Sequence, residues 1–173
     1  MEKKFRAYLI GNKIVSNATE AFSLNSQSYI GDKIENKIHY SFVEILYLLK
    51  KGKVLLFKDK KKISSDAFMK IAEKKEHNFF ARYIVYSDLK NRGYIVKTAL
   101  KFGADFRVYE KGKKPGEEHA KWVVFAVYET DKLTWYEFAA KNRVAHSTKK
   151  NLLIAIVDAE GDITYYECRW LKP

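Results

Sequence analysis

The clearest alternation of apolar and polar positions along the chain lies in residues 104–109. A period of two is typical of a β-strand that buries one of its faces. Residues 94–98 are rich in β-forming side chains, so the two segments predict a pair of strands that meet at a bend around Gly103. Tyr109 ends the second strand on its polar face, next to a basic, glycine-containing loop over residues 111–116.

Helical signals occur in four segments of the chain. A capping box, in which Ser or Thr is followed three residues later by Glu, opens two of the helices, at Ser41 and Thr134. Gly52 and Gly93 end two of them, because glycine readily adopts the left-handed conformation that terminates a helix. The predicted helices are residues 42–51, 65–75, 79–92 and 135–148.

The degree of patterning also predicts which segments are buried. The third of these helices presents Phe80, Tyr83 and Ile84 on one face, and we expect this face to be buried. Residues 17–38 are polar and weakly patterned, which predicts short strands and loops there. Residues 152–157 are continuously apolar, which predicts a strand that is buried on both faces.

The hydrophobic pattern restarts around residues 76–78, and we place a domain boundary there. Residues 1–76 would form a small N-terminal mixed α/β domain, and residues 77–173 a C-terminal domain. Further strands are predicted at residues 5–10, 13–16, 54–57, 120–128 and 163–170. In the C-terminal domain the order helix, several strands, helix, two strands predicts a mixed central sheet flanked by helices. The fold class is therefore α/β in the broad sense, of the α+β kind.

Charge adds a class of partner to this picture. The 173 residues include 33 Lys and Arg against 21 Asp and Glu, a net charge of +12. Such an excess suits a polyanion such as nucleic acid, although a protein that places lysine on every solvated face has the same composition.

The cysteine count and the distribution of apolar residues argue against several other classes of protein. The single cysteine, Cys168, excludes a disulfide or a cysteine-based metal site within one chain. No apolar run approaches the ~20 residues that span a membrane, so no membrane partner is expected. Residues 1–5 lack the apolar core of a signal peptide, and we expect a cytoplasmic protein.

Individual residues do not identify a reaction. The four histidines have no spacing that would place two metal ligands on one helix face, and no metal site is predicted. Asp105 and Glu118 remain open as a carboxylate pair for two-metal phosphodiester cleavage. By itself His119 is typical of a structural or surface histidine, Tyr109 is one of twelve tyrosines, and Lys150 is one of many lysines.

Two longer motifs in combination are more specific. The segments 93–109 (GYIVKTALKFGADFRVY) and 143–150 (RVAHSTKK), the second followed by an apolar strand, resemble the signature of the archaeal tRNA-splicing endonucleases. Between them Glu118 and His119 open a strand, as in that family. The resemblance is strong over residues 82–173. It is weaker in the first half, where residues 41–48 resemble the family's first long helix.

The resemblance implies a metal-independent endoribonuclease that excises introns from precursor tRNA at bulge-helix-bulge motifs, with no cofactor. The family's catalytic Tyr, His and Lys fall on Tyr109, His119 and Lys150. RNA supplies its own nucleophile, the 2′-hydroxyl, so cleavage needs a base, an acid and a cation. The resemblance assigns these roles to Tyr109, His119 and Lys150, in that order. It implies a lyase-type transesterification that leaves 2′,3′-cyclic phosphate and 5′-hydroxyl ends.

RNA contacts also follow from the resemblance. Family members hold a flipped-out base of the bulge between cationic or aromatic side chains, and Arg143 matches one such position. The second position is Trp170 here, where some relatives have Arg. A Trp face also stacks on a base or a guanidinium, but packing at a dimer interface explains Trp170 equally well.

Two cuts in one substrate require two active sites, so the resemblance implies an oligomer. The last strand would pair with its copy to form a dimer, and dimers would form a homotetramer, or a heterotetramer with a structural subunit. The turn containing Asp158, Glu160 and Asp162 resembles the acidic loop that inserts into a basic pocket of a partner subunit. An ordinary solvated hairpin is the alternative reading of that turn.

Two other functions remain open. The chain could be a non-catalytic architectural or RNA-binding subunit of a splicing endonuclease, or a basic RNA-binding module without chemistry. A structural subunit does not need all three catalytic residues, and this chain has them, which favours the enzyme.

Overall fold

The computed structural model of the protein describes residues 4–171, and of Phe102 it describes the backbone alone. Residues 1–3, part of the segment considered above as a signal peptide, lie outside this range. The chain forms two compact units, of which the first ends at Tyr83 and the second begins at Ile84. The domain boundary proposed after residue 76 falls in the turn between helices α3 (Ser65–Glu73) and α4 (Phe79–Asn91). Within residues 4–171, every helix is too short or too polar to cross a lipid bilayer.

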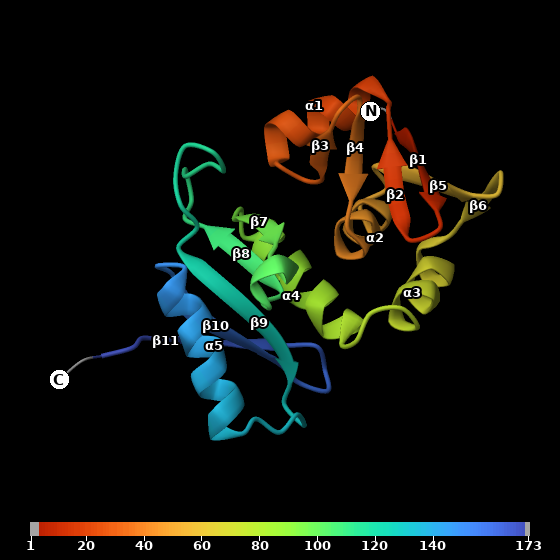
Figure 1. Ribbon diagram of the computed structural model, residues 1–173. Helices are drawn as coiled ribbons and strands as arrows, with labels where there is room; N and C mark the ends of the chain where they lie inside the picture. The colour runs from red at the N-terminus through yellow and green to blue at the C-terminus, as the bar shows by residue number, and fades with distance from the viewer. Residues whose placement is uncertain (1–3, 172–173) are drawn as a thin grey trace. The chain divides into compact units, whose positions relative to one another are not determined.

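The first unit is built on a mixed six-stranded sheet in the order β3-β4-β2-β1-β5-β6 (Figure 1). Strands β1 and β5 are parallel, and the other neighbouring pairs are antiparallel. The elements of this unit are β1 (Phe5–Ile10), β2 (Lys13–Ser16), α1 (Thr19–Ser28), β3 (Asp32–Ile34), β4 (Lys37–Tyr40), α2 (Phe42–Lys50), β5 (Val54–Lys58), β6 (Lys61–Ile63) and α3 (Ser65–Glu73).

Helix α1 corrects the expectation of short strands and loops over residues 17–38. Only Ala21 of its ten residues is buried, and its N-cap, Ala18, provides no side-chain hydrogen bond. The helix therefore lacks both an apolar stripe and a capping signal, the two features by which a helix is recognised in a sequence. Its end is set by Tyr29, which has a left-handed φ of 58° and donates its backbone N–H to the Asn25 carbonyl.

Helix α2 confirms the capping box predicted at Ser41. The Ser41 hydroxyl accepts from the Glu44 backbone N–H, and the Glu44 carboxylate accepts from the Ser41 backbone N–H at 2.8 Å. Glu44 also accepts from the backbone N–H of Gly31 at 2.9 Å, and its side chain is buried. One carboxylate therefore caps α2 and fixes the chain that enters β3.

The second unit is built on a mixed five-stranded sheet in the order β11-β10-β9-β8-β7 (Figure 1). Strands β9 and β10 are parallel, and the other neighbouring pairs are antiparallel. The elements are α4 (Phe79–Asn91), which begins in the first unit, β7 (Ile95–Thr98), the short 3-10 helix η1 (Leu100–Phe102), β8 (Phe106–Tyr109), β9 (Trp122–Tyr128), α5 (Trp135–Ser147), β10 (Asn151–Val157) and β11 (Ile163–Cys168).

Helices contact both faces of this sheet, which confirms the predicted layers. On one face the Tyr86 ring of α4 packs against the Phe106 ring of β8, with 5.7 Å between centroids. On the other face α5 covers a buried cluster that includes Val123, Phe125 and Leu152. The capping box at Thr134 that opens α5 is also confirmed.

Two burial predictions differ from the structure. In α4 the predicted apolar face is wrong, because Phe80 is 38% exposed whereas Val85, Tyr86 and Leu89 are buried. Large side chains of α4 itself point to all sides of the helix, so its sequence pattern does not show which side is buried. In strand β10 (Asn151–Val157) only Leu152, Ala155 and Val157 are buried, while Leu153, Ile154 and Ile156 are half-buried. These three half-buried residues lie near the edge strand β11, where the single chain covers the sheet incompletely.

Candidate active site

Three strand ends meet at one edge of the second sheet. Strand β10 is parallel to β9, so both begin at this edge, and β8 is antiparallel to β9, so β8 ends there. Tyr109 is the last residue of β8, His119 lies in the loop before β9, and Lys150 directly precedes β10. All three line one pocket of about 360 Å³. Its other lining residues are Arg107, Gly116, Glu117, Glu118 and Ala120.

Tyr109 is held in place by the ladder between β8 and β7, where it pairs with Ile95. It lies on the same strand face as Arg107, as the alternation predicts. Although this is the polar face of the strand, Tyr109 is buried, with 4% of its surface exposed. Its face of the sheet is the one that α5 covers, and burial of the ring leaves Tyr109 directed into a lined pocket rather than into bulk solvent.

The loop that carries His119 is folded back on itself. The backbone N–H of Glu118 donates to the Lys114 carbonyl at 3.0 Å, and the Glu118 carboxylate forms an ion pair with Lys113. At the end of the loop the backbone N–H of Lys121 donates to the Val108 carbonyl at 2.9 Å. The loop is therefore anchored on both sides of His119, close to the end of β8. The His119 side chain itself is exposed.

Lys150 is positioned by the sharp end of α5. The backbone of Lys149 has a left-handed φ of 55°, which turns the chain from the helix into β10. The Lys150 ammonium donates to the Thr148 carbonyl at 2.8 Å. Burial lowers the pKa of Lys150, and the positive charge of Arg107 lowers this pKa further. Arg107 and Lys150 are therefore close enough to repel each other across the pocket.

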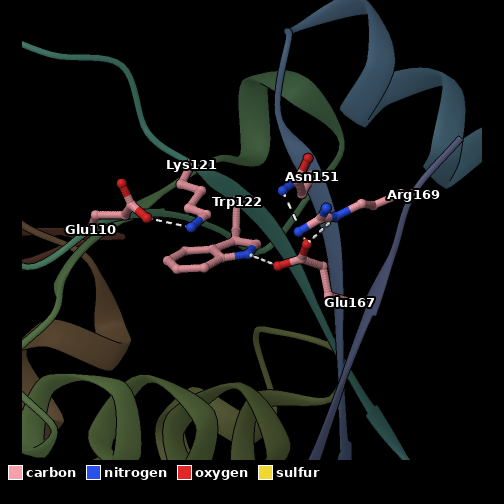
Figure 2. Close-up of polar contacts among 6 residues, drawn as sticks. All are labelled: Glu110, Lys121, Trp122, Asn151, Glu167 and Arg169. Atoms are coloured by element: carbon pink, nitrogen blue, oxygen red, sulfur yellow. Dashed lines mark hydrogen bonds and ion pairs between the residues drawn. The ribbon is translucent and has the colours of Figure 1, made fainter.

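A network of polar contacts joins six residues of the second unit: Glu110, Lys121, Trp122, Asn151, Glu167 and Arg169 (Figure 2). The Glu167 carboxylate on β11 accepts from the Trp122 indole at 2.7 Å, from Asn151 at 3.2 Å and from Arg169 at 2.5 Å. Lys121 lies over the Trp122 ring, 4.7 Å from its centroid, and forms an ion pair with Glu110.

The sequence positions of this network are informative. Glu110 directly follows Tyr109, Lys121 is two residues after His119, and Asn151 directly follows Lys150. Neighbouring residues of an extended chain point to opposite faces, so Glu110 and Asn151 hold the backbone from the face opposite to Tyr109 and Lys150. Glu167 joins the starts of β9 and β10, the two strands that follow His119 and Lys150.

We expect Glu167→Ala to disturb the pocket without altering any residue that lines it. Three donors lose one acceptor, so Tm should fall by about 2–4 °C, as for a loss of about 1 kcal/mol in hydrogen bonding. The backbone amide resonances of residues 119–121 and 150–151 should shift in a ¹H–¹⁵N correlation spectrum. Thr164→Ala, at an exposed position of the same strand, is the control. Shifts confined to residues 165–169 would contradict a positioning role.

The two predicted RNA contacts lie in different surroundings. Arg143 is exposed on α5, with its guanidinium carbon 6.0 Å from the Tyr136 ring centroid. Trp170 is 59% exposed, and its ring centroid lies 4.8 Å from that of His146. Trp170 also lines a second pocket, of about 180 Å³, of which Lys150 forms part of the wall. Lys150 thus borders both pockets.

The acidic turn lies at the other end of β10 from Lys150. The Asp162 backbone N–H donates to the Asp158 carboxylate at 2.8 Å, and the Asp158 backbone N–H donates to the Asp162 carbonyl at 3.1 Å. Glu160 is exposed at the tip. The turn is thus a closed hairpin that presents its Glu160 carboxylate to solvent.

The carboxylates considered for two-metal cleavage have separate partners. Asp105 accepts from the backbone N–H of Ala126 at 2.9 Å, and Glu118 pairs with Lys113. Within residues 4–171, no group of three or more His, Cys, Asp or Glu side chains is placed to hold a metal ion.

Arg107 is a cationic pocket residue that was not among the sequence-predicted site residues. Alternation placed it on the strand face of Tyr109, two residues earlier, and this spacing is the signal that could have identified it. Arg107 also lies within the motif of residues 93–109 that carries the family resemblance, but no role was assigned to it there.

Comparisons with known proteins match both halves of the chain. The family model described as tRNA intron endonuclease, catalytic C-terminal domain, matches residues 79–165, and the corresponding N-terminal domain model matches residues 5–69. The chain is 40% identical to the tRNA-splicing endonuclease of Thermococcus kodakarensis, over 95% of this chain and 97% of the relative. For the protein of that name from Methanothermobacter thermautotrophicus the values are 40%, 95% and 96%. The Nanoarchaeum equitans protein of that name is 45% identical, over 76% of this chain and 88% of the relative.

Proposed function

Because the chain belongs to the tRNA intron endonuclease family, we propose that it excises introns from precursor tRNA by cutting RNA at bulge-helix-bulge motifs. The observation that carries this proposal is the shared pocket of Tyr109, His119 and Lys150. These residues come from three separate segments, and an acid, a base and a cation at one point are what RNA transesterification requires.

In the proposed step, the 2′-oxygen beside the scissile phosphate attacks phosphorus and the 5′-oxygen leaves. Tyr109 takes the proton of the 2′-hydroxyl, and His119 gives a proton to the leaving 5′-oxygen. Lys150 faces the phosphate oxygens, on which negative charge increases during the reaction. The products are a 2′,3′-cyclic phosphate and a 5′-hydroxyl. No metal ion or cofactor takes part in this step.

Tyrosine is a weak base at neutral pH, because its ordinary pKa is ~10. The phenolate is the basic form of tyrosine, and two cationic side chains, Lys150 and Arg107, line the same pocket as Tyr109. A protonated imidazole can give a proton to a leaving oxygen, which is the role proposed for His119.

Arg143 and Trp170 are the proposed contacts to the RNA outside the scissile phosphate. Both are exposed, and Trp170 lies beside Lys150 in the second pocket. A base that leaves the helical stack next to the cleaved bond could stack on the Trp170 face. The net charge of +12 supports binding of a polyanion in general.

We further propose that the chain acts as an oligomer in which β11 pairs with its copy. β11 is an edge strand, and an edge strand exposes backbone donors and acceptors that can pair with another chain. Tyr166 on β11 is 54% exposed, and Ile154 and Ile156 are half-buried beside it. A homotetramer, or a heterotetramer with a structural subunit, would provide two active sites. The acidic turn of Asp158, Glu160 and Asp162 would bind a basic surface of another subunit.

The experiment that tests the function uses the purified chain, EDTA and a precursor tRNA whose intron boundaries form a bulge-helix-bulge. We expect two cuts, with ends that resist phosphatase until acid opens the cyclic phosphate, and a particle mass that is a multiple of the chain mass. A 2′-deoxy substitution at either cleavage site should abolish that cut alone, because the nucleophile is missing.

Two controls test the motif specificity and the metal-independent chemistry. A precursor in which the bulges are closed by base pairing should stay intact, and its cleavage would contradict the motif specificity. Activity that disappears in EDTA and returns with Mg²⁺ would contradict the proposed metal-independent chemistry. Binding without any cleavage would favour the non-catalytic subunit or the RNA-binding module.

A further inference from the structure

Arg107 occupies the same pocket as the three proposed catalytic residues. It lies on β8 two residues before Tyr109, so the two side chains project from the same face of the strand. Both line the pocket of about 360 Å³ with His119 and Lys150. The Arg107 backbone pairs with Val123 of β9, which places it inside the sheet rather than on a flexible loop.

The Arg107 guanidinium is incompletely satisfied by the protein. Its Nε atom is buried and has no hydrogen-bond partner within residues 4–171. A buried donor without a partner costs about 1–3 kcal/mol, and more when the group is charged. The side chain that carries this atom also lines the pocket, where an acceptor atom of a ligand would contact the guanidinium.

The charges around Arg107 favour an anionic ligand. The groups that line its pocket are Lys150, Tyr109, His119, Glu117 and Glu118. Glu118 already pairs with Lys113, and both glutamates are exposed on the loop that carries His119. Arg107 and Lys150 repel each other, and an anion held between them would relieve the repulsion.

We propose that Arg107 is a second cationic contact to the scissile phosphate, and that its guanidinium binds a non-bridging phosphate oxygen next to the one that Lys150 faces. This inference rests on the proposed function and adds a residue to its site. The planar guanidinium presents several N–H groups at once, which suits phosphate oxygens better than a single ammonium does.

Substitution of Arg107 tests this contact. Arg107→Met should lower kcat by about 10²-fold with little change in KM, the loss seen when one donor to a developing oxyanion is removed. Arg107→Lys should fall between the wild type and Arg107→Met, because it keeps the charge and loses the fork of donors. Lys132→Met, in an exposed loop of the same unit, loses one charge and should match the wild type. A rise in KM alone would overturn the proposal.

A binding measurement separates this inference from the proposed function. Inorganic phosphate should bind the unmutated chain without any cleavage, and Arg107→Met should weaken this binding about tenfold or more, as for loss of one charge-assisted hydrogen bond. If the chain cuts no precursor tRNA but binds phosphate through Arg107, the function fails and the anion contact stands. If Arg107→Met keeps both kcat and phosphate affinity, the contact is wrong.

The pKa of Lys150 is a further readout, because it would not change if Arg107 had only a structural role. Removing Arg107 removes one of the two causes that lower the Lys150 pKa, so this pKa should rise in Arg107→Met. A ¹³C-lysine titration followed by NMR measures it directly. An unchanged Lys150 pKa in a folded Arg107→Met protein would show that the two cations do not share one site and would overturn the proposal. If Arg107→Met does not fold, Arg107→Lys tests the proposal instead. Wild-type kcat and phosphate affinity in Arg107→Lys would then overturn it.

Discussion

His119→Ala is expected to lower the rate of intron cleavage by about 10²–10⁴-fold, the contribution of one positioned proton donor. Precursor tRNA binding should stay within about twofold of the wild type, because a surface substitution that leaves the phosphate-binding cations in place removes little affinity. His119 is exposed on an anchored loop, so the substitution should not disturb folding. Single-turnover cleavage and filter binding measure the two quantities on the same preparations.

The matched control for this variant is His77→Ala. His77 is an exposed histidine in the turn before α4, outside the pocket, and its loss should change neither rate nor binding. Cleavage by His119→Ala at the wild-type rate would show that another group protonates the leaving oxygen. Loss of binding together with cleavage would place His119 in RNA recognition instead.

Gly31→Ala is expected to be among the most destabilising single substitutions in the first unit. Gly31 has a φ of +77°, and a Cβ built there lies 2.5 Å from Ile38 Cγ2 and 2.8 Å from Tyr40 Cε1. Backbone strain and overpacking together should lower the free energy of unfolding by about 2–5 kcal/mol. Gly31 also donates its N–H to the Glu44 carboxylate that caps α2, so displacement of this backbone would weaken the cap.

Gly52→Ala separates the two causes. Gly52 has a comparable φ of +67°, but nothing lies within 4 Å of the Cβ that alanine would add. It should therefore lose only the conformational part, about 1–2 kcal/mol. Urea unfolding followed by far-UV circular dichroism compares the two variants. Equal losses for both would show that the space around Gly31 has no energetic role.

Local signals explain which elements were predictable. The capping boxes at Ser41 and Thr134 depend on residues three positions apart, and both are present in the structure. Helix α1 was missed because it buries one of its ten residues and has no side-chain cap. The buried face of α4 was also misassigned, since a helix with large side chains all round has no single apolar stripe and its neighbours select the face.

The sequence by itself identified the family through motifs around Tyr109, His119 and Lys150, and it predicted the mixed sheet between helices. The family follows from the resemblance of two motifs that are each shorter than twenty residues, and the layers follow from the periodicity and order of the predicted elements. The roles of the three residues stay predictions until cleavage is measured.

Long-range strand pairing, by contrast, was needed to bring these residues into one pocket. β9 and β10 start at the end of the sheet where β8 stops. His119 and Lys150, which are 31 positions apart along the chain, therefore line the same pocket. The same pairing placed Arg107 beside Lys150 and brought Glu167 to Trp122 and Asn151. No local pattern encodes such proximity, because it depends on which strands pair and in which register, and that is settled by burial and hydrogen bonding over the whole sheet.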